Sequence, residues 1–325
     1  MLGQHHEKTL KDRRIVSFLP AATEMIYALG LGDRLVGVSH ECDFPAEATS
    51  KPVVSRPAFD MTGMTAAQID GDISERLRRG ESIYRIDERL LRELRPHVIV
   101  TQDLCQVCAP SGNELGVALR GLDATPEVLF MSPTSIAEIE SNVLDLGRVT
   151  GCEEAARALV SDMEMRLHRL TQRATGLRRV RLFIAEWVDP LFCSGHWAPE
   201  MAAYAGGDDA LGPKGGDSAR IAWDDVVAWA PEIIVVAPCG FRLAGALEQA
   251  AQLLSLPHWA EIPAVREGRV YAVDANAYFA RPGPRVVDGA ELLAHLIHPD
   301  EFDWRGGADA FAKVPLTSSI DLRAP

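Results

Sequence analysis

The stretch CEEAARALVSDMEMRLHRLTQRATG, from Cys152 to Gly176, predicts one long helix in the middle of the chain. Its apolar residues recur at three- and four-residue steps, and arginines gather toward its end. Thr150 and Glu153 have the spacing of a capping box, and Gly176 supplies a stop. At about 1.5 Å per residue, about 25 residues span roughly 37 Å. Such a helix either connects two lobes or lies as an ordinary amphipathic helix inside one domain.

On both sides of this helix, short apolar runs alternate with helical patterns, which is typical of parallel α/β sheets. The run RIVSFL at 14–19 is echoed by RVRLFI at 179–184. We therefore predict an α/β fold with two Rossmann-like lobes of mainly parallel strands, joined by one long backbone helix. The predicted boundaries are 1–150 for the N-terminal lobe, 151–176 for the connecting helix, 177–300 for the C-terminal lobe and 301–325 for an irregular tail. Residues 57–80 look like an insertion.

Composition excludes several classes of partner. The 325 residues are 47% hydrophobic and carry a formal net charge of −13, without an evident Lys/Arg-rich face, so nucleic acids and anionic membranes are not expected to bind. The apolar run from Ile15 to Leu19 is shorter than the roughly 7 to 15 residues of a secretory leader, and no segment approaches the roughly 20 apolar residues of a membrane span. We predict a cytoplasmic protein, or a periplasmic one if a leader precedes this start site.

Cysteines concentrate where apolar runs end. Five of the six follow such a run, namely Cys42, Cys105, Cys108, Cys193 and Cys239. Each one taken singly is most often a small buried hydrophobe, but loops at the carboxyl ends of parallel strands also gather ligands. If the two lobes face one another, these loops would converge on one cleft that also holds Trp187, Trp197, Phe241, Tyr278 and Phe279. Such a cleft suits a large planar ligand, a metal chelate or a directly held metal ion.

Cys105 and Cys108 have the spacing of half a zinc or iron-sulfur site, but no second C-x₂-C pair accompanies them. Completion would need other residues such as Cys42 or Cys239. A thioredoxin-like redox pair is disfavoured because the next helix opens only after Pro110. The sequence has no G-x-S-x-G elbow, H-E-x-x-H pair or P-loop, so it offers little for an enzyme. His40 and His196 are by themselves more typical of hydrogen-bonded loop residues.

Several motifs together resemble the helical-backbone class, class III, of periplasmic substrate-binding proteins, which serve ABC importers of cobalamin, haem and iron-siderophores. They are SFLPAATE at 17–24, PHVIVTQ at 96–102, the long helix, AGG at 205–207, VREGRVY at 265–271 and RPGPR at 281–285. The match extends from about Ile15 to His298. Within the class, SHECD at 39–43, residues 101–108 and GHWAPE at 195–200 look like a subgroup described as cobalamin-binding proteins.

The resemblance implies a non-catalytic protein that holds a corrinoid such as cobalamin, or a related metal chelate, in the cleft between the lobes. The aromatic rings would pack on the macrocycle, Arg281 would meet amides or a phosphate, and His40 or His196 would approach the metal. The full predicted set of ligand-binding residues is His40, Glu41, Cys42, Gln102, Asp103, Cys105, Trp187, His196, Trp197, Cys239, Phe241, Tyr278, Phe279 and Arg281.

This chain departs from the importer members in its start, which has no recognisable leader, and in its cysteine-bearing loops. Both departures count against docking to an ABC permease. The alternative is a cytoplasmic metalloprotein or redox enzyme with zinc or an iron-sulfur cluster held by Cys42, Cys105, Cys108 and Cys239.

Overall fold

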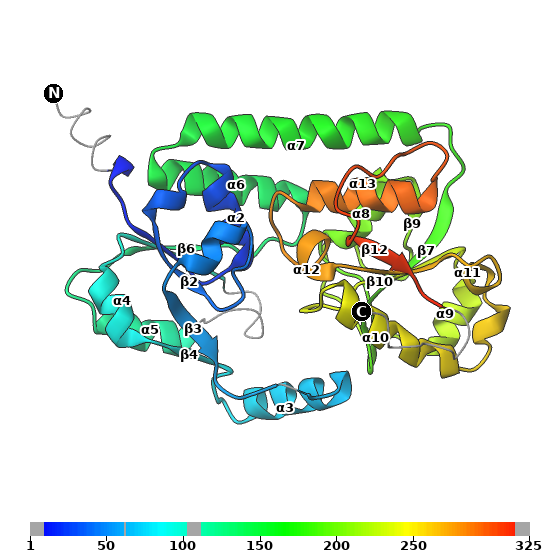
Figure 1. Cartoon of the computed structure of the whole chain (residues 1–325), viewed down its shortest axis with the longest axis horizontal. Coiled ribbons are helices and arrows are strands. Elements are labelled where there is room, and N and C mark those ends of the chain that lie inside the picture. Colours follow the sequence, from blue (N-terminus) through cyan, green and yellow to red (C-terminus); the bar gives the residue numbers. More distant parts are fainter. Residues whose placement is uncertain (1–9, 62, 103–111, 316–325) are drawn as a thin grey trace. The chain divides into compact units, whose positions relative to one another are not determined.

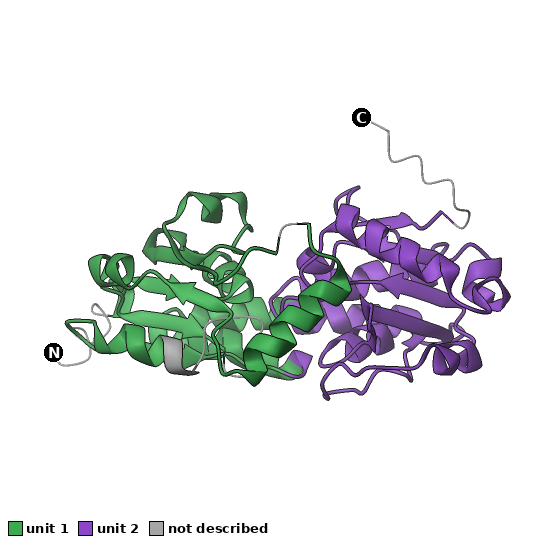
Figure 2. Cartoon of the chain, turned by 90° about the horizontal axis from the view of Figure 1, so that it is seen from below, with its two compact units in different colours: residues 1–133, 137–162 green, residues 134–136, 163–325 purple. Residues whose placement is uncertain are grey.

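The computed structural model describes residues 10–61, 63–102 and 112–315 (Figure 1). The chain divides into two compact units, which comprise residues 1–133 with 137–162 and residues 134–136 with 163–325 (Figure 2). Each unit contains one six-stranded sheet of mainly parallel strands. The prediction of two α/β lobes and a long helix is therefore confirmed.

In unit 1, the strand order is β4-β3-β2-β1-β5-β6, and only β4 runs antiparallel to its neighbour. The strands are β1 (Ile15–Ser17), β2 (Leu35–Ser39), β3 (Val53–Pro57), β4 (Tyr84–Ile86), β5 (Val98–Thr101) and β6 (Glu127–Phe130). The helices are α2 (Pro20–Ala28), α3 (Ala66–Arg78), α4 (Glu88–Leu94), α5 (Gly112–Arg120) and α6 (Ile136–Thr150), with short 3₁₀ helices η1 (Gly32–Arg34) and η2 (Ala46–Ser50).

One face of this sheet packs on α4 and α5. Val16 and Phe18 of the β1 region join Leu91 of α4 and Ala118 of α5 in a single buried cluster. Strands β3 and β4 were not predicted from the sequence, and they flank the predicted insertion. Within it, α3 opens at Thr65, whose hydroxyl accepts a hydrogen bond from the Gln68 amide in a complete capping box.

The long helix is α7 (Glu153–Ala174). Its buried stripe consists of Ala156, Val160, Met163, Leu167 and Leu170. The predicted capping role of Thr150 is wrong, because this residue ends α6 and its hydroxyl donates to the carbonyl of Leu146. Gly151 then takes a positive φ of 71°, which separates the two helices sharply.

In unit 2, the strand order is β12-β11-β10-β7-β8, and β9 also pairs with β7. The strands are β7 (Val180–Val188), β8 (Leu191–Cys193), β9 (Gly207–Asp208), β10 (Ile233–Val236), β11 (Val270–Val273) and β12 (Phe311–Lys313). The helices are α8 (Ala198–Tyr204), α9 (Trp223–Trp229), α10 (Leu243–Ala250), α11 (Pro263–Arg266), α12 (Ala275–Tyr278) and α13 (Val286–Ile297), with 3₁₀ helices η3 (Ala251–Ser255) and η4 (Trp259–Glu261). Strand β12 belongs to the tail that was expected to be irregular.

Arg166 of α7 anchors the second part of this helix to α13. Its guanidinium lies 2.5 Å from Asp288 Oδ1 and 2.7 Å from Glu291 Oε2. Within each sheet, the strand order reverses beside one central strand, β1 in unit 1 and β7 in unit 2. Ligands of open α/β sheets bind at the carboxyl edge near such a reversal. These two edges are therefore the expected places for a ligand.

Candidate ligand-binding site

At the carboxyl edge of unit 1, His40 and Glu41 follow β2. The His40 amide donates to the Ser55 carbonyl at 3.1 Å, and its ring lies 6.1 Å from the ring of Tyr84. Burial lowers the pKa of His40; a hydrogen bond with the Ser55 backbone opposes this effect, and the nearby Arg56 adds to it. The imidazole is therefore neutral near pH 7, which is the state that can ligate a metal. Its Nδ1 atom, however, is buried and has no hydrogen-bond partner in the described parts of the chain.

Cys42 points into the protein. It is only 4% exposed, and its sulfur accepts a hydrogen bond from Thr23 Oγ1 at 3.0 Å. Ser39 Oγ lies 3.3 Å from the same sulfur. These contacts join α2 to the loop after β2, which gives the thiol a packing role.

Gln102 follows β5 and is buried, while the predicted residues Asp103, Cys105 and Cys108 lie outside the described residues. Sequence reasoning overlooked two exposed aromatic side chains of unit 1, Phe44 after β2 and Phe130 at the end of β6, which are 44% and 49% exposed. Because β2 and β6 belong to the parallel part of one sheet, both rings lie toward its carboxyl edge. The available signal was the position of Phe130 at the end of a strand and of Phe44 in the loop that follows one.

In unit 2, the last residues of β7 and the loop after β10 bring two aromatic rings together. The rings of Trp187 and Phe241 are 5.7 Å apart and tilted by 59°, and both side chains are partly exposed. The Trp187 indole donates to the Asp189 carbonyl at 3.0 Å. Cys239 is exposed in the same loop as Phe241, and its amide donates to the Glu186 carbonyl at 3.1 Å. Trp187, Phe241 and Cys239 therefore share one face at the strand-order reversal of unit 2.

A second group surrounds the start of α8. The indole of Trp197 donates to the Phe279 carbonyl at 2.8 Å, and the His196 ring lies 5.5 Å from the Trp197 ring. Trp197 is only 9% exposed and Phe279 is buried as well, so both contribute mainly to packing of this edge. Tyr278 is partly exposed and meets Trp304 edge-on at 5.5 Å.

Two carboxylates inside unit 2 form a network that the sequence did not reveal as a unit. Glu186 accepts hydrogen bonds from the Gly195 amide at 3.1 Å and from the Ser218 hydroxyl. Asp209 accepts one from the Ser194 hydroxyl. Burial raises the pKa of Glu186 to about 7, although these hydrogen bonds lower it. Burial raises the pKa of Asp209 to about 7 as well. The network fixes the segment 209–218 against the loop that carries His196.

Three arginines surround one carboxylate after β11. Asp274 caps α12 by accepting from the Ala277 amide at 2.9 Å. Burial raises the pKa of Asp274, while the hydrogen bond from the Ala277 amide and the positive charges of Arg242, Arg285 and Arg281 oppose this rise. Three guanidinium groups therefore lie within electrostatic reach of one carboxylate after β11.

Within the described residues, no group of three or more His, Cys, Asp or Glu side chains could hold a metal ion. Cys42 is buried in unit 1 and Cys239 is exposed in unit 2, and the other two cysteines of the predicted metal set lie outside the described residues. No observation on the described residues supports a zinc or iron-sulfur site.

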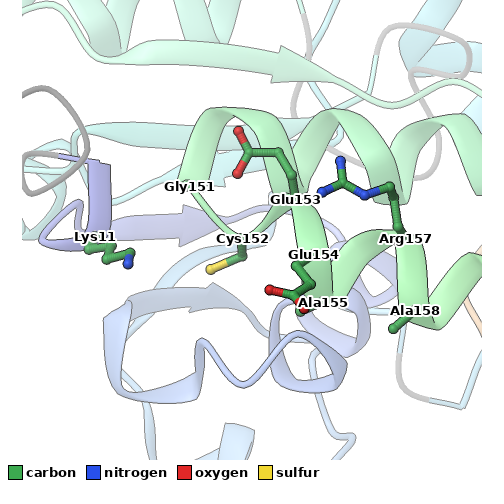
Figure 3. A pocket seen from close by; sticks show the side chains of 8 residues that line it. All are labelled: Lys11, Gly151, Cys152, Glu153, Glu154, Ala155, Arg157 and Ala158. Carbon is green, nitrogen blue, oxygen red and sulfur yellow. The ribbon is translucent and has the colours of Figure 1, made fainter. Parts of the chain in front are cut away.

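Two cavities lie at the opposite, amino edges of the sheets. One of about 770 Å³ lies beside the start of α7 and is lined by Lys11, Cys152, Glu153, Glu154 and Arg157 among others (Figure 3). The other, of about 450 Å³, lies beside the start of β7 and is lined by Arg178, Arg269 and His298 among others. Neither includes a predicted site residue. None of the described helices combines the length and apolarity needed to cross a membrane.

Comparison with known proteins gives one family. The family model described as periplasmic binding protein matches residues 15–277. An uncharacterized ABC transporter substrate-binding lipoprotein of Bacillus subtilis is 27% identical over 310 residues, which cover 92% of this chain and 85% of that protein. A vitamin B12-binding protein of Vibrio cholerae is 26% identical over 292 residues, which cover 88% of this chain and 89% of that protein.

Solved structures show the same fold. The periplasmic vitamin B12 binding protein BtuF of Vibrio cholerae matches with a TM-score of 0.60 and 22% identity, covering 88% of this chain and 97% of that one. A periplasmic heme binding protein of Pseudomonas aeruginosa matches with a TM-score of 0.68 and 20% identity, covering 94% and 96%.

The predicted cytoplasmic location is wrong, because these similar proteins are periplasmic proteins and a lipoprotein. The prediction rested on the shortness of the apolar run from Ile15 to Leu19. In the structure, Ile15–Ser17 is the central strand β1 of a sheet, so this run was never a candidate for a leader. The sequence-based argument against an ABC transporter therefore loses the part that rested on the leader.

Proposed function

The chain belongs to the periplasmic binding protein family, and we propose that it binds a corrinoid such as cobalamin at the carboxyl-edge loops of the sheet in unit 2. The observation that carries the proposal is the partly exposed ring pair of Trp187 and Phe241 at the strand-order reversal of unit 2. Two similar proteins are named for vitamin B12 binding, which supports the choice of a corrinoid over other chelates.

The aromatic and arginine side chains at the carboxyl edge of unit 2 fit such a ligand. Large aromatic rings bury apolar area against a flat macrocycle at a low cost in side-chain entropy. Arg242, Arg281 and Arg285 suit a phosphodiester, because a guanidinium recognises phosphate oxygens through paired hydrogen bonds. Cobalamin combines a planar corrin with one phosphodiester.

In this proposal the protein passes its ligand to an ABC importer. Family membership and the similarity to a substrate-binding lipoprotein support this role. Cys42 contributes packing, and the exposed Cys239 borders the ligand beside Phe241.

The proposal is tested by ligand-dependent thermal stability. Full-length protein is melted alone and with excess cyanocobalamin, hemin or a ferric siderophore. A ligand at a hundred times its Kd stabilises the folded state by about 2.7 kcal/mol, which shifts the melting temperature by several degrees. We expect the largest rise with cyanocobalamin. A rise with hemin or the siderophore alone, or with none of the three, contradicts the proposal.

A further inference from the structure

The backbone of His196 is held in a conformation that a histidine rarely adopts. Its φ is 53°, in the left-handed region, which costs an L-residue with a β-carbon of the order of 1–2 kcal/mol. Two hydrogen bonds to a neighbouring segment maintain it. The His196 amide donates to the Gly216 carbonyl at 2.6 Å, and its carbonyl accepts from the Gly215 amide at 3.1 Å. The surrounding structure thus fixes this residue on both sides of its Cα.

The segment that holds His196 is itself fixed by the carboxylate of Glu186. Glu186 accepts from the Gly195 amide and from the Ser218 hydroxyl, so one side chain ties the residue before His196 to the segment opposite. The approach is so close that a β-carbon on Gly195 would lie 2.3 Å from the Ser218 nitrogen. The backbone of His196 is therefore held in place by the segment around Gly215 and Ser218.

The two ring nitrogens of His196 have different surroundings. Nε2 lies 3.3 Å from Asp217 Oδ1; the side chain of His196 is 22% exposed and that of Asp217 is 86% exposed. For Nδ1, no described residue supplies a hydrogen-bond partner. Histidines that ligate metals commonly donate their other ring N–H to a carboxylate, which fixes the tautomer and leaves the free nitrogen as the donor to the metal. His196 with Asp217 has this arrangement.

His40, the other histidine predicted to approach the metal, is less suited. Its Nδ1 atom is buried, and its Nε2 lies 3.9 Å from Glu41. His258 also has a left-handed φ, of 58°, but its Nδ1 is 2.9 Å from Glu261 Oε1 and it lies beside η4, outside the predicted ligand loops. Among these three, His196 combines a fixed backbone, a nearby carboxylate and a ring nitrogen that no described residue contacts by a hydrogen bond.

We propose that His196 binds the metal of the chelate as an axial ligand through Nδ1, and that Asp217 is the positioning residue that holds Nε2–H. This inference rests on the proposed function, since it needs a metal chelate at the carboxyl edge of unit 2. The lone pair of the imidazole forms one coordinate bond to cobalt, and a water molecule leaves that axial position. No electron transfer is involved.

The probe is cobinamide, a corrinoid that lacks the nucleotide base, so that its axial positions are open. Full-length protein is loaded with cob(II)inamide and examined by electron paramagnetic resonance, with natural or ¹⁵N-labelled histidine. We expect each cobalt line to split into a triplet from one axial nitrogen, and into a doublet after ¹⁵N labelling. His196→Asn, which tolerates a left-handed φ, should remove the splitting and lower the affinity for cobinamide about tenfold or more.

Two variants complete the test. His258→Asn, a matched change at another left-handed histidine, should leave splitting and affinity unchanged. Asp217→Asn should keep the splitting and lower the affinity by less than His196→Asn. Calorimetric binding of cobinamide without nitrogen splitting, or splitting that persists in His196→Asn, overturns this inference alone. Absence of binding heat with both cobinamide and cobalamin overturns the proposed function together with it.

Discussion

The hydroxyl of Ser194 donates a hydrogen bond to the buried carboxylate of Asp209, which lies within electrostatic reach of Glu186. Burial is the main reason why the pKa of Asp209 rises from 3.8 to about 7. Below about pH 4 the carboxyl is protonated in both the folded and the unfolded state. Between about pH 4 and 7 the unfolded chain releases this proton and the folded protein retains it, so the free energy of unfolding falls as the pH rises.

Asp209→Asn removes this titration and keeps an oxygen that can accept from Ser194. Each pKa unit corresponds to about 1.4 kcal/mol, so the variant should gain roughly 2–4 kcal/mol of stability relative to wild type between pH 4.5 and pH 8. Urea unfolding of both proteins at the two pH values measures this change. Asp189→Asn, at an exposed carboxylate, serves as the control. A stability difference that is the same at both pH values would show that Asp209 does not titrate in this way.

Trp187→Ala should weaken cyanocobalamin binding about tenfold or more, which corresponds to about 1.4 kcal/mol of binding energy, with little loss of folding stability. The reason is that the ring is partly exposed and pairs with Phe241 at the proposed site. Calorimetric titration measures the affinity. Trp229→Phe is the matched control, because Trp229 donates to the Leu182 carbonyl near the start of β7, far along the strand from its carboxyl end. Equal effects of the two substitutions would contradict the assigned role of Trp187.

Cys239 should react with a thiol reagent much faster than Cys42 and Cys193, because it is exposed and they are buried. Ligand should slow the labelling of Cys239, since this thiol shares a loop with Phe241. Labelling followed by mass spectrometry assigns the rate to each cysteine. The slower reaction of a buried thiol also provides an internal reference. Labelling of Cys239 at an unchanged rate with saturating ligand would place the ligand away from this loop.

Gly195→Ala should weaken both folding and ligand binding. Its new β-carbon would meet the backbone of Ser218, which must shift and release the segment that holds His196. Gly71→Ala in α3 is the matched control, because nothing lies within 4 Å of its new β-carbon. That variant should be stabilised by about 0.5–1 kcal/mol through helix propensity. Chemical unfolding and cobalamin titration distinguish the two. Normal affinity in a folded Gly195→Ala protein would show that the close approach at Gly195 is unimportant for the site.

Short-range sequence patterns predicted the strands and the helix whose formation depends mainly on residues close together in the sequence. Hydrophobic periodicity and secondary-structure propensity are enough to recognise the apolar runs of β5, β7 and β10 and the periodic apolar stripe of α7. The predicted capping role of Thr150 was wrong because the same hydroxyl can cap a following helix or donate a hydrogen bond to the preceding one. The carbonyl of Leu146, four residues earlier, was the better acceptor. Strand β12 was missed because its pairing partner, β11, lies about 40 residues away in sequence.

The site was only partly predictable. Trp187 lies near the carboxyl end of β7 and Phe241 follows β10, so their positions relative to the apolar runs were enough to select them. Asp209 and Ser218 lie in irregular segments and acquire their roles only when folding brings them to Ser194 and Glu186. Exposure of Cys239 and burial of Cys42 likewise depend on tertiary packing, since both thiols follow similar apolar runs.

Calorimetric titration of the full-length wild-type protein with cyanocobalamin tests the central claim most directly. We expect saturable heat with one ligand per chain and a Kd of about 1 μM or tighter, which corresponds to about −8 kcal/mol. No measurable heat at protein and ligand concentrations of about 100 μM, under conditions where the protein is folded, would contradict the assignment of a corrinoid ligand.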